Sequence, residues 1–421
     1  MVYKAKIDFS ISTLLFVLFD LTSVSNRKGS SMNSDRFVFS QLSDFLPRYE
    51  FNKCVARYRG NWRVRTFSCY DQLLAMMFAQ LTGQESLRDT AISLGTVRNK
   101  LFHAGFRNND IAKSTLADAN ENRDWRIYAD FAQVLIGHAR LLYRNEPFAV
   151  ELEQPAYVFD STTVDLCLSL FPWAKFRHRK GAVKLHTLLD LRGNLPCYIQ
   201  ITNGNVHDVN LLDDLVVEPG AFYIMDRGYT DFERLYRLSR QAAFYVIRAK
   251  FNLGYSVRDS RTFDRSTGLR NDQTIVLDGY QTSRDYPQPL RRISYIDVET
   301  EKRYIYLTNN FSLPALTIAQ LYKARWEIEL FFKWIKQNLR IKAFYGYSDN
   351  AVRTQIWIAV ITYVLLAIIK AELKCVLSLG EIIQTLRTPI LDKVNIKQLL
   401  SNNKKINDGF TSNNQLLLLD F

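Results

Sequence analysis

The stretch Ala156-Tyr-Val-Phe-Asp160-Ser-Thr-Thr-Val164 is an apolar, β-branched run with one aspartate inside it. Such a run predicts a buried strand. Runs of the same texture follow at Ala182–Asp190, Leu195–Thr202, Phe222–Asp226 and Phe244–Ala249. The sequence therefore predicts five strands, and the first of them carries a carboxylate in its interior.

The segments between these strands predict how the strands connect. Asp190-Leu-Arg-Gly-Asn194 is typical of a hairpin turn, whereas Val209–Val217 and Asp231–Ala242 have helical spacing. Three consecutive strands, a helix, a strand, a helix and a strand predict a mixed sheet with helices packed on it, of α+β or α/β class. This is the order of a ribonuclease-H-like domain.

The residues that precede the sheet are predominantly helical in pattern. Between Arg48 and Arg65, six arginines and lysines face one acid, Glu50, with Tyr58 and Trp62 interleaved. Two interpretations stay open, a solvated basic face and an element that contacts DNA. We assign residues 32–150 to a helical DNA-binding domain and expect that fragment to bind DNA by itself.

The remaining boundaries follow from changes in composition. Met32 is a plausible start, so residues 1–31 are predicted to be an upstream extension. Residues 151–250 are predicted to form the first part of the ribonuclease-H-like core, and residues 303–377 the second part. Residues 251–302 are polar with short alternating stretches and predict a β-rich insertion, while residues 378–421 are expected to be a tail.

Composition limits the class of protein. The 421 residues include 55 Lys+Arg and 42 Asp+Glu, a formal net charge of +13, and 47% are hydrophobic. This excludes a disordered chain and favours a polyanionic partner. Five widely spaced cysteines fit a reducing cytosol. The apolar run Ile356–Ile369 is too short to span a membrane and predicts a buried core helix.

The most specific pattern is Tyr322-Lys-Ala-Arg-Trp-Glu-Ile-Glu329, which continues to Lys336. At 100° per residue, Tyr322, Arg325, Glu329, Lys333 and Lys336 share one face of a single predicted helix. An apolar stripe lies beside that face and consists of Leu321, Ile328, Phe332, Ile335 and Leu339. Glu327 is predicted to point away from both. The alternative is an ordinary amphipathic helix with ion pairs along its surface.

Two strand aspartates favour a catalytic interpretation. Asp160 interrupts its strand and Asp226 closes another, and a buried acid is costly unless it is paired or binds metal. If these strands are neighbours, both aspartates can share a Mg²⁺ ion while Glu329 completes a second site. Two such ions would support phosphoryl transfer. Asp190 and Asp231 are better explained as turn and cap residues. His207 is better explained as a structural histidine than as one that orients a metal-bound water.

The spacing of Tyr322, Arg325, Glu329 and Lys336 resembles the YREK signature of the insertion-sequence-four family of bacterial DDE transposases. The resemblance extends to Asp160-Ser-Thr, Asp226-Arg-Gly-Tyr and Val206-His-Asp, and it runs over most of residues 32–370. It implies a ribonuclease-H-like core, cut-and-paste transposition that depends on Mg²⁺ or Mn²⁺, and metal binding by Asp160, Asp226 and Glu329.

The resemblance further implies that Tyr322, Arg325 and Lys336 contact transposon-end DNA, with Lys333 and Trp326 as helpers. Arg227 and Tyr229, beside the second aspartate, are expected to contact DNA as well. A basic run between Asp165 and Asp190 is predicted to bind phosphates; it comprises Lys175, Arg177, Arg179, Lys180 and Lys184. We expect the protein to bind double-stranded DNA and to form a homodimer in the synaptic complex. The expected location is the bacterial cytoplasm, without a membrane. The alternatives are a non-catalytic DNA-binding regulator derived from a transposase and a metal-dependent nuclease without strand transfer.

Overall fold

The computed structural model describes residues 35–402, except for 108–109, 149, 178–179, 251, 298 and 342. The backbone alone is described at Arg177 and Asn402. The predicted extension 1–31 and Arg179 therefore lie outside the described residues.

One mixed sheet holds the ten strands of the described part, in the order β2-β3-β1-β5-β6-β10-β9-β8-β7, with β4 also paired to β3. The strands are β1 (Ala156–Leu166), β2 (Lys175–Arg177), β3 (Lys180–Asp190), β4 (Leu195–Asn203), β5 (Phe222–Met225), β6 (Phe244–Arg248), β7 (Tyr255–Ser260), β8 (Leu269–Leu277), β9 (Leu290–Ile296) and β10 (Arg303–Thr308).

The first part of this sheet has the predicted connectivity. β1, β5 and β6 are parallel, whereas β3 is antiparallel to both β1 and β4. The β3–β4 hairpin turns through Gly193 and Asn194, both at positive φ. A Cβ atom at Gly193 would lie 2.4 Å from the Tyr143 ring, so glycine is required there. The ribonuclease-H-like strand order is thus confirmed.

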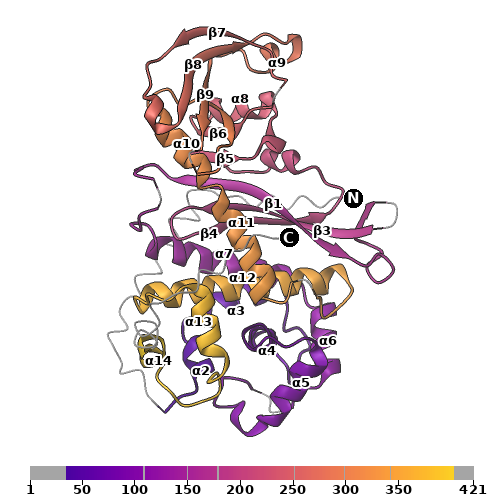
Figure 1. Ribbon diagram of the computed structural model, residues 1–421. Coiled ribbons are helices and arrows are strands. Elements are labelled where there is room, and N and C mark those ends of the chain that lie inside the picture. The colour runs from indigo at the N-terminus through magenta and orange to yellow at the C-terminus, as the bar shows by residue number, and fades with distance from the viewer. Residues whose placement is uncertain are drawn as a thin grey trace.

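The predicted insertion, residues 251–302, is β-rich as expected, and it continues the same sheet. β9 pairs with β10, which pairs in turn with the core strand β6. Figure 1 shows these strands extending the sheet away from β1 and β3. The insertion therefore shares a continuous backbone ladder with the core.

Helices cover both faces of the sheet (Figure 1). One face, which includes Tyr157 and Phe159, packs against α8 and the short 3₁₀ helices η3 and η4. The other, which includes Val158 and Val164, joins the large helical part. The helices are α2 (Val38–Ser43), α3 (Arg48–Arg57), α4 (Cys69–Thr82), α5 (Leu87–Thr96), η2 (Arg98–Lys100), α6 (Lys113–Asn122), α7 (Arg126–Leu142), η3 (Asp208–Asp213), η4 (Arg227–Tyr229), α8 (Phe232–Arg240), η5 (Arg265–Thr267), α9 (Tyr280–Asp285), α10 (Ala315–Lys323), α11 (Trp326–Asn338), α12 (Asp349–Glu372), α13 (Leu379–Arg387) and α14 (Ile396–Asn402).

The apolar run Ile356–Ile369 lies in α12, and all of its side chains are buried, which confirms the core-helix prediction. α12 is long and apolar enough to cross a membrane by composition, and 94% of its most apolar window is buried inside the protein. It contacts α4, α6, α7 and α13. Burial on every side explains why its sequence is apolar all round.

Two sequence expectations are wrong. The described part of the predicted tail, 378–402, contains α13 and α14, whereas 403–421 lie outside the described residues. Main-chain N–H groups of Val38 and Phe39 donate to the carbonyls of Asp392 and Ile390 in this part. The predicted helix Val209–Val217 is instead the short 3₁₀ helix η3. The residue before Pro219 is biased away from helical dihedrals, and the β-branched pair Val216-Val217 adds little helix propensity.

Candidate active site

Asp160 and Asp226 are brought together by the parallel pairing of β1 and β5. The pairing ends with Phe159 opposite Met225, so Asp160 is the next residue of β1 and Asp226 directly follows β5. The main-chain N–H of Ser161 donates to Asp160 Oδ1 at 2.8 Å. The condition stated for a shared site, that these two strands are neighbours, is met.

The third carboxylate, Glu329, lies on α11, and the signature from Tyr322 to Lys336 is divided between two helices rather than carried by the one predicted. α10 ends at Lys323 and α11 begins at Trp326, with Ala324 and Arg325 between them. Both intervening residues keep right-handed dihedrals, with ψ of −11° and −27°. This tight junction places Tyr322 beside Asp226 and Arg325 between Asp160 and Glu329.

Arg325 links two of the three acids. Its Nη1 donates to Asp160 Oδ2 at 3.1 Å and its Nη2 donates to Glu329 Oε1 at 2.6 Å. The third acid is held separately, because the Tyr322 hydroxyl donates to Asp226 Oδ1 at 3.2 Å. Every carboxylate of the predicted triad is therefore hydrogen-bonded to a residue of the YREK signature.

The electrostatics of Asp160 reflect this arrangement. Burial raises the pKa of Asp160 to about 6, although the Ser161 amide and the Arg325 charge oppose the rise. The negative charges of Asp226 and Glu329 raise the same pKa further. The three acids thus lie within electrostatic reach of one another, and positive charge near them stabilises the ionised forms.

The donor set suits a hard divalent cation, since the three carboxylates offer the oxygen ligands that Mg²⁺ prefers. Among the described residues, however, no three acidic, histidine or cysteine side chains are close enough together to hold one ion. The predicted convergence on shared metals is therefore incomplete in this conformation. Arg325 supplies the positive charge between Asp160 and Glu329.

An open depression of about 500 Å³ lies beside these groups. Asp160 and Glu329 form part of its wall, and the other lining residues are Ser161, Thr162, Phe332, Lys333, Lys336 and Gln337. Two carboxylates and two lysines thus face a common space that is open to solvent. Such a mixture can bind metal ions on one side and phosphates on the other.

Lys336 also ties α11 to the catalytic strand. Its Nζ donates to Thr162 Oγ1 at 2.6 Å and to the Thr163 carbonyl at 2.9 Å. Lys333 and Trp326 are exposed on the same helix. The predicted apolar stripe, which runs from Leu321 of α10 to Leu339 just after α11, is buried as expected.

Several predicted DNA contacts are buried or engaged elsewhere. Tyr322 is buried and its ring lies 4.7 Å from that of Tyr306. Tyr229 is buried against Phe159, which argues against a DNA contact in this conformation. Lys184 donates to Asp208 and to the Val206 carbonyl. The remaining predicted contacts Lys175, Lys180 and Arg227 are exposed, and the side chain of Arg177 is outside the described set.

The sequence interpretation missed a polar cluster beside β1, formed by His186, Thr202 and Asp208. His186 pairs in register with Ser161 and is fully buried, and its Nε2 lies 2.8 Å from Thr202 Oγ1. Its Nδ1 is 3.5 Å from Asp208 Oδ1. Burial lowers the pKa of His186 to about 4. His207, by contrast, is exposed. The 22 to 24 residues that separate Asp208 from its partners carry no local signal of this contact.

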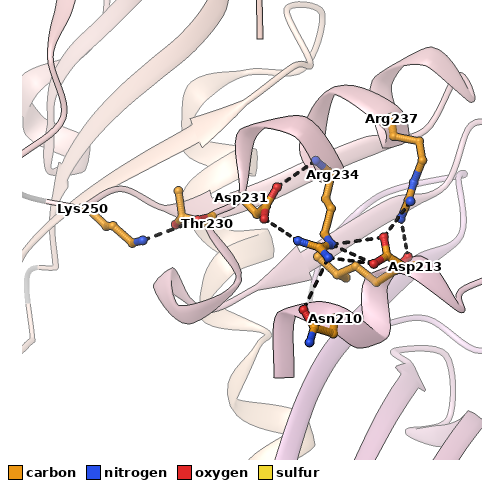
Figure 2. A network of polar contacts seen from close by, with 8 residues as sticks. Asn210, Asp213, Thr230, Asp231, Arg234, Arg237 and Lys250 are labelled. Atoms are coloured by element: carbon orange, nitrogen blue, oxygen red, sulfur yellow. Dashed lines mark hydrogen bonds and ion pairs between the residues drawn. The ribbon is translucent and has the colours of Figure 1, made fainter. Parts of the chain in front are cut away.

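An ion-pair network fixes the segment that follows Asp226. Figure 2 shows Arg234 and Arg237 of α8 reaching Asp213 at the end of η3, and both ion pairs are 2.7 Å long. Asp231 caps α8 as predicted, accepting from the Arg234 amide. The hydrogen bond from Arg234 lowers the pKa of Asp213. The network thus joins η3, which precedes β5 in the chain, to α8, which follows it.

Glu327 points away from the acids, as predicted, and is only partly exposed. Its Oε2 accepts a hydrogen bond from Asn194 Nδ2 at 2.7 Å. Asn194 belongs to the β3–β4 turn. Glu327 thus holds α11 against that hairpin and takes no part in the carboxylate group.

Two parts of the chain match known protein families. Residues 151–365, just over half of the chain, match the family described as Transposase DDE domain. Residues 34–107 match a family described as Domain of unknown function (DUF4372). The first match covers all ten strands of the described residues and the helices α10 and α11, and it contains Asp160, Asp226 and Glu329.

Similar proteins include a candidate transposase, y4zB, from Sinorhizobium fredii, 36% identical over 60% of this chain and 70% of that protein. A candidate transposase of insertion sequence element IS5377 from Geobacillus stearothermophilus is 33% identical over 52% of this chain and 57% of that protein. A cryo-EM structure of the piggyBac transposase synaptic complex with hairpin DNA is 12% identical, with a TM-score of 0.41, and the match covers 90% of this chain and 84% of that chain. The chain belongs to the family of transposases with a DDE domain.

Proposed function

We propose that this protein is a DNA transposase that cleaves at the terminal inverted repeats of its element and joins the ends to target DNA. The observation that supports this most strongly is the hydrogen bonding of Asp160, Asp226 and Glu329 to Arg325 and Tyr322. Helices with only a structural role would have no need to direct these polar side chains at Asp160, inside β1, and at Asp226, just after β5.

Asp160, Asp226 and Glu329 would hold Mg²⁺ or Mn²⁺. A bound ion would activate the attacking hydroxyl and stabilise the leaving oxygen in phosphoryl transfer. Arg325 and Lys336 keep α11 against β1 and present positive charge to the DNA phosphates. The exposed Lys333 extends this charge along the depression.

The test uses a supercoiled plasmid that carries the DNA flanking the gene, incubated with the full-length protein and Mg²⁺. The proposal predicts excision of the element and its insertion into a second plasmid. Cleavage without joining would favour a metal-dependent nuclease. Binding without cleavage would favour the non-catalytic regulator derived from a transposase, and either outcome would overturn the proposal.

The wider setting is part of the same proposal. DNA ends are brought together by a homodimer in the synaptic complex, and the protein acts on DNA in the bacterial cytoplasm. Crosslinking in the presence and absence of end DNA tests the dimer. A monomer bound to each end, with no crosslinked pair under cleavage conditions, would contradict it.

A further inference from the structure

The loop between α3 and α4, residues 58–67, contains a group of exposed cations around an exposed tryptophan. Trp62 is 71% exposed, and Arg59, Arg63 and Arg65 are all exposed beside it. No acid occurs from Phe51 to Tyr70. We call Arg59, Trp62, Arg63 and Arg65 the Trp62 loop.

The structure divides the six cations of the basic segment into two groups. Arg48 lies 3.7 Å from the centre of the Tyr70 ring. Lys53 pairs with Glu50, and Arg57 pairs with Asp130. In the part of the chain that the structure describes, the three arginines of the Trp62 loop form no ion pair. Their charge is therefore available to an external anion.

The loop is held rigidly on its inner side. A Cβ atom at Gly60 would lie 2.4 Å from Ile127 Cδ1, so the backbone sits directly on α7. Asn61 Oδ1 accepts from the Cys69 amide at 2.8 Å, and the Tyr58 hydroxyl donates to Asp130 at 3.0 Å. An ordered scaffold that exposes a large indole reduces the entropy lost when that indole binds a partner.

Backbone conformation gives an independent sign of function. Arg59 and Arg63 have φ of 51° and 57°, in the left-handed region that disfavours side chains. Glycine or asparagine would fit these positions with less strain. Arginine at both positions is therefore explained better by what its side chain binds than by what it contributes to the fold.

We propose that the Trp62 loop is a DNA-binding site at which the arginines contact phosphates and the Trp62 indole stacks on an unpaired base. Arginines and an exposed aromatic side chain together are the usual means of holding single-stranded DNA. The Arg63 guanidinium already lies 5.9 Å from the indole centre, so charge and stacking surface act on adjacent parts of one nucleotide. The inference deepens the proposed function by naming one of its DNA contacts.

The test measures binding of the full-length protein to fluorescent (dT)20 and to a blunt duplex, as a function of salt. Trp62→Ala is expected to weaken (dT)20 binding about tenfold while changing duplex binding little, because stacking needs an unpaired base. Arg59→Gly and Arg63→Gly are expected to weaken binding to both probes and to make the salt dependence less steep. Equal binding by Trp62→Ala and wild type would overturn the stacking assignment.

Stability and a matched control keep the test specific. Arg59→Gly and Arg63→Gly should melt no lower than wild type, since each relieves a positive φ. A large loss of stability in either would overturn the binding explanation.

The control is Tyr280→Ala, which removes another exposed aromatic ring beside an arginine. Tyr280, on α9, is 79% exposed, and Arg284 lies 5.5 Å from its ring. The control variant is expected to leave (dT)20 binding unchanged, and a matching tenfold loss would overturn the assignment to this loop.

Photocrosslinking separates this inference from the proposed function. With 5-iododeoxyuridine in the single strand, the crosslinked peptide is expected to contain Trp62, and crosslinks confined to other tryptophans would overturn the proposal. The Glu329→Gln variant should crosslink like wild type. If no plasmid cleavage occurs and Trp62 is still crosslinked, the transposase proposal fails while the DNA-binding site stands.

Discussion

Arg325 is the residue on which the geometry of the site depends. It donates to Asp160 and to Glu329, and it stands at the junction of α10 and α11. The planar guanidinium of arginine has N–H donors on separate nitrogen atoms and can bridge two carboxylates. The ammonium group of lysine has a single nitrogen atom and is less suited to this role. The spacing of the signature predicted that Arg325 and Glu329 share a face. It did not predict the contact with Asp160, which is 165 residues away in sequence.

The two glutamates of α11 have different expected roles. Glu329→Gln keeps the size of the side chain and removes the charge that would bind metal. We expect it to reduce end cleavage by at least about 10³-fold, within the range of single catalytic groups. DNA-end binding should be largely retained. Gel-shift and cleavage assays on the same labelled end duplex measure both quantities.

Glu327→Gln is the matched control. The amide oxygen of glutamine can still accept the hydrogen bond from Asn194, so cleavage should fall by less than about tenfold. Equal losses in the two variants, or a greater loss at Glu327, would mean that Glu329 is not the third acid.

At the scale of elements, the strands were predictable and the helix junction was not. Apolar runs in the sequence predicted five strands, β1, β3, β4, β5 and β6. A strand that buries one face alternates apolar and polar residues, and a strand that buries both faces is apolar throughout, so burial itself produces the pattern. The break between α10 and α11 involves Ala324 and Arg325. Neither is proline or glycine, so no local signal marked it.

Arg291 of β9 connects the insertion to the signature helices. Its guanidinium pairs with Asp272 at 2.7 Å and donates to the carbonyl of Leu313, just before α10, at 2.6 Å. Both charged side chains are almost fully buried. Arg291→Met should therefore leave Asp272 uncompensated and cost about 3–5 kcal/mol of stability.

Urea unfolding of the Arg291→Met variant measures this cost. The midpoint should fall without a change in the slope of the transition. Arg284→Met, on the exposed helix α9, provides the comparison and should shift stability by less than about 0.5 kcal/mol. An unchanged midpoint for Arg291→Met would show that the buried pair contributes no net stability.

At the scale of the whole molecule, the helical part is built from both ends of the chain. α12 and α13 pack against α4, and the residues after α13 bond to the backbone of α2. The sequence suggested an independent domain at residues 32–150 because composition changes near Pro155. Contacts between segments more than 200 residues apart leave no such local mark.

A fragment of residues 32–150 is consequently not expected to fold alone. Without α12, the buried face of α7 would be exposed to water, at a cost of roughly 25 cal/mol per Å² of apolar surface. Circular dichroism and limited proteolysis of the fragment should show little stable structure. Cooperative thermal unfolding of the fragment would contradict this prediction.

The central claim is that Asp160, Asp226 and Glu329 hold the cations used in DNA cleavage. The direct measurement is cleavage of a labelled transposon-end duplex by wild type and Asp226→Asn, each assayed with Mg²⁺, with Mn²⁺ and with a chelator. Wild type should cleave with either metal and be inactive in chelator, and Asp226→Asn should be at least about 10³-fold slower with Mg²⁺. Full activity in chelator, or in Asp226→Asn, would contradict the account.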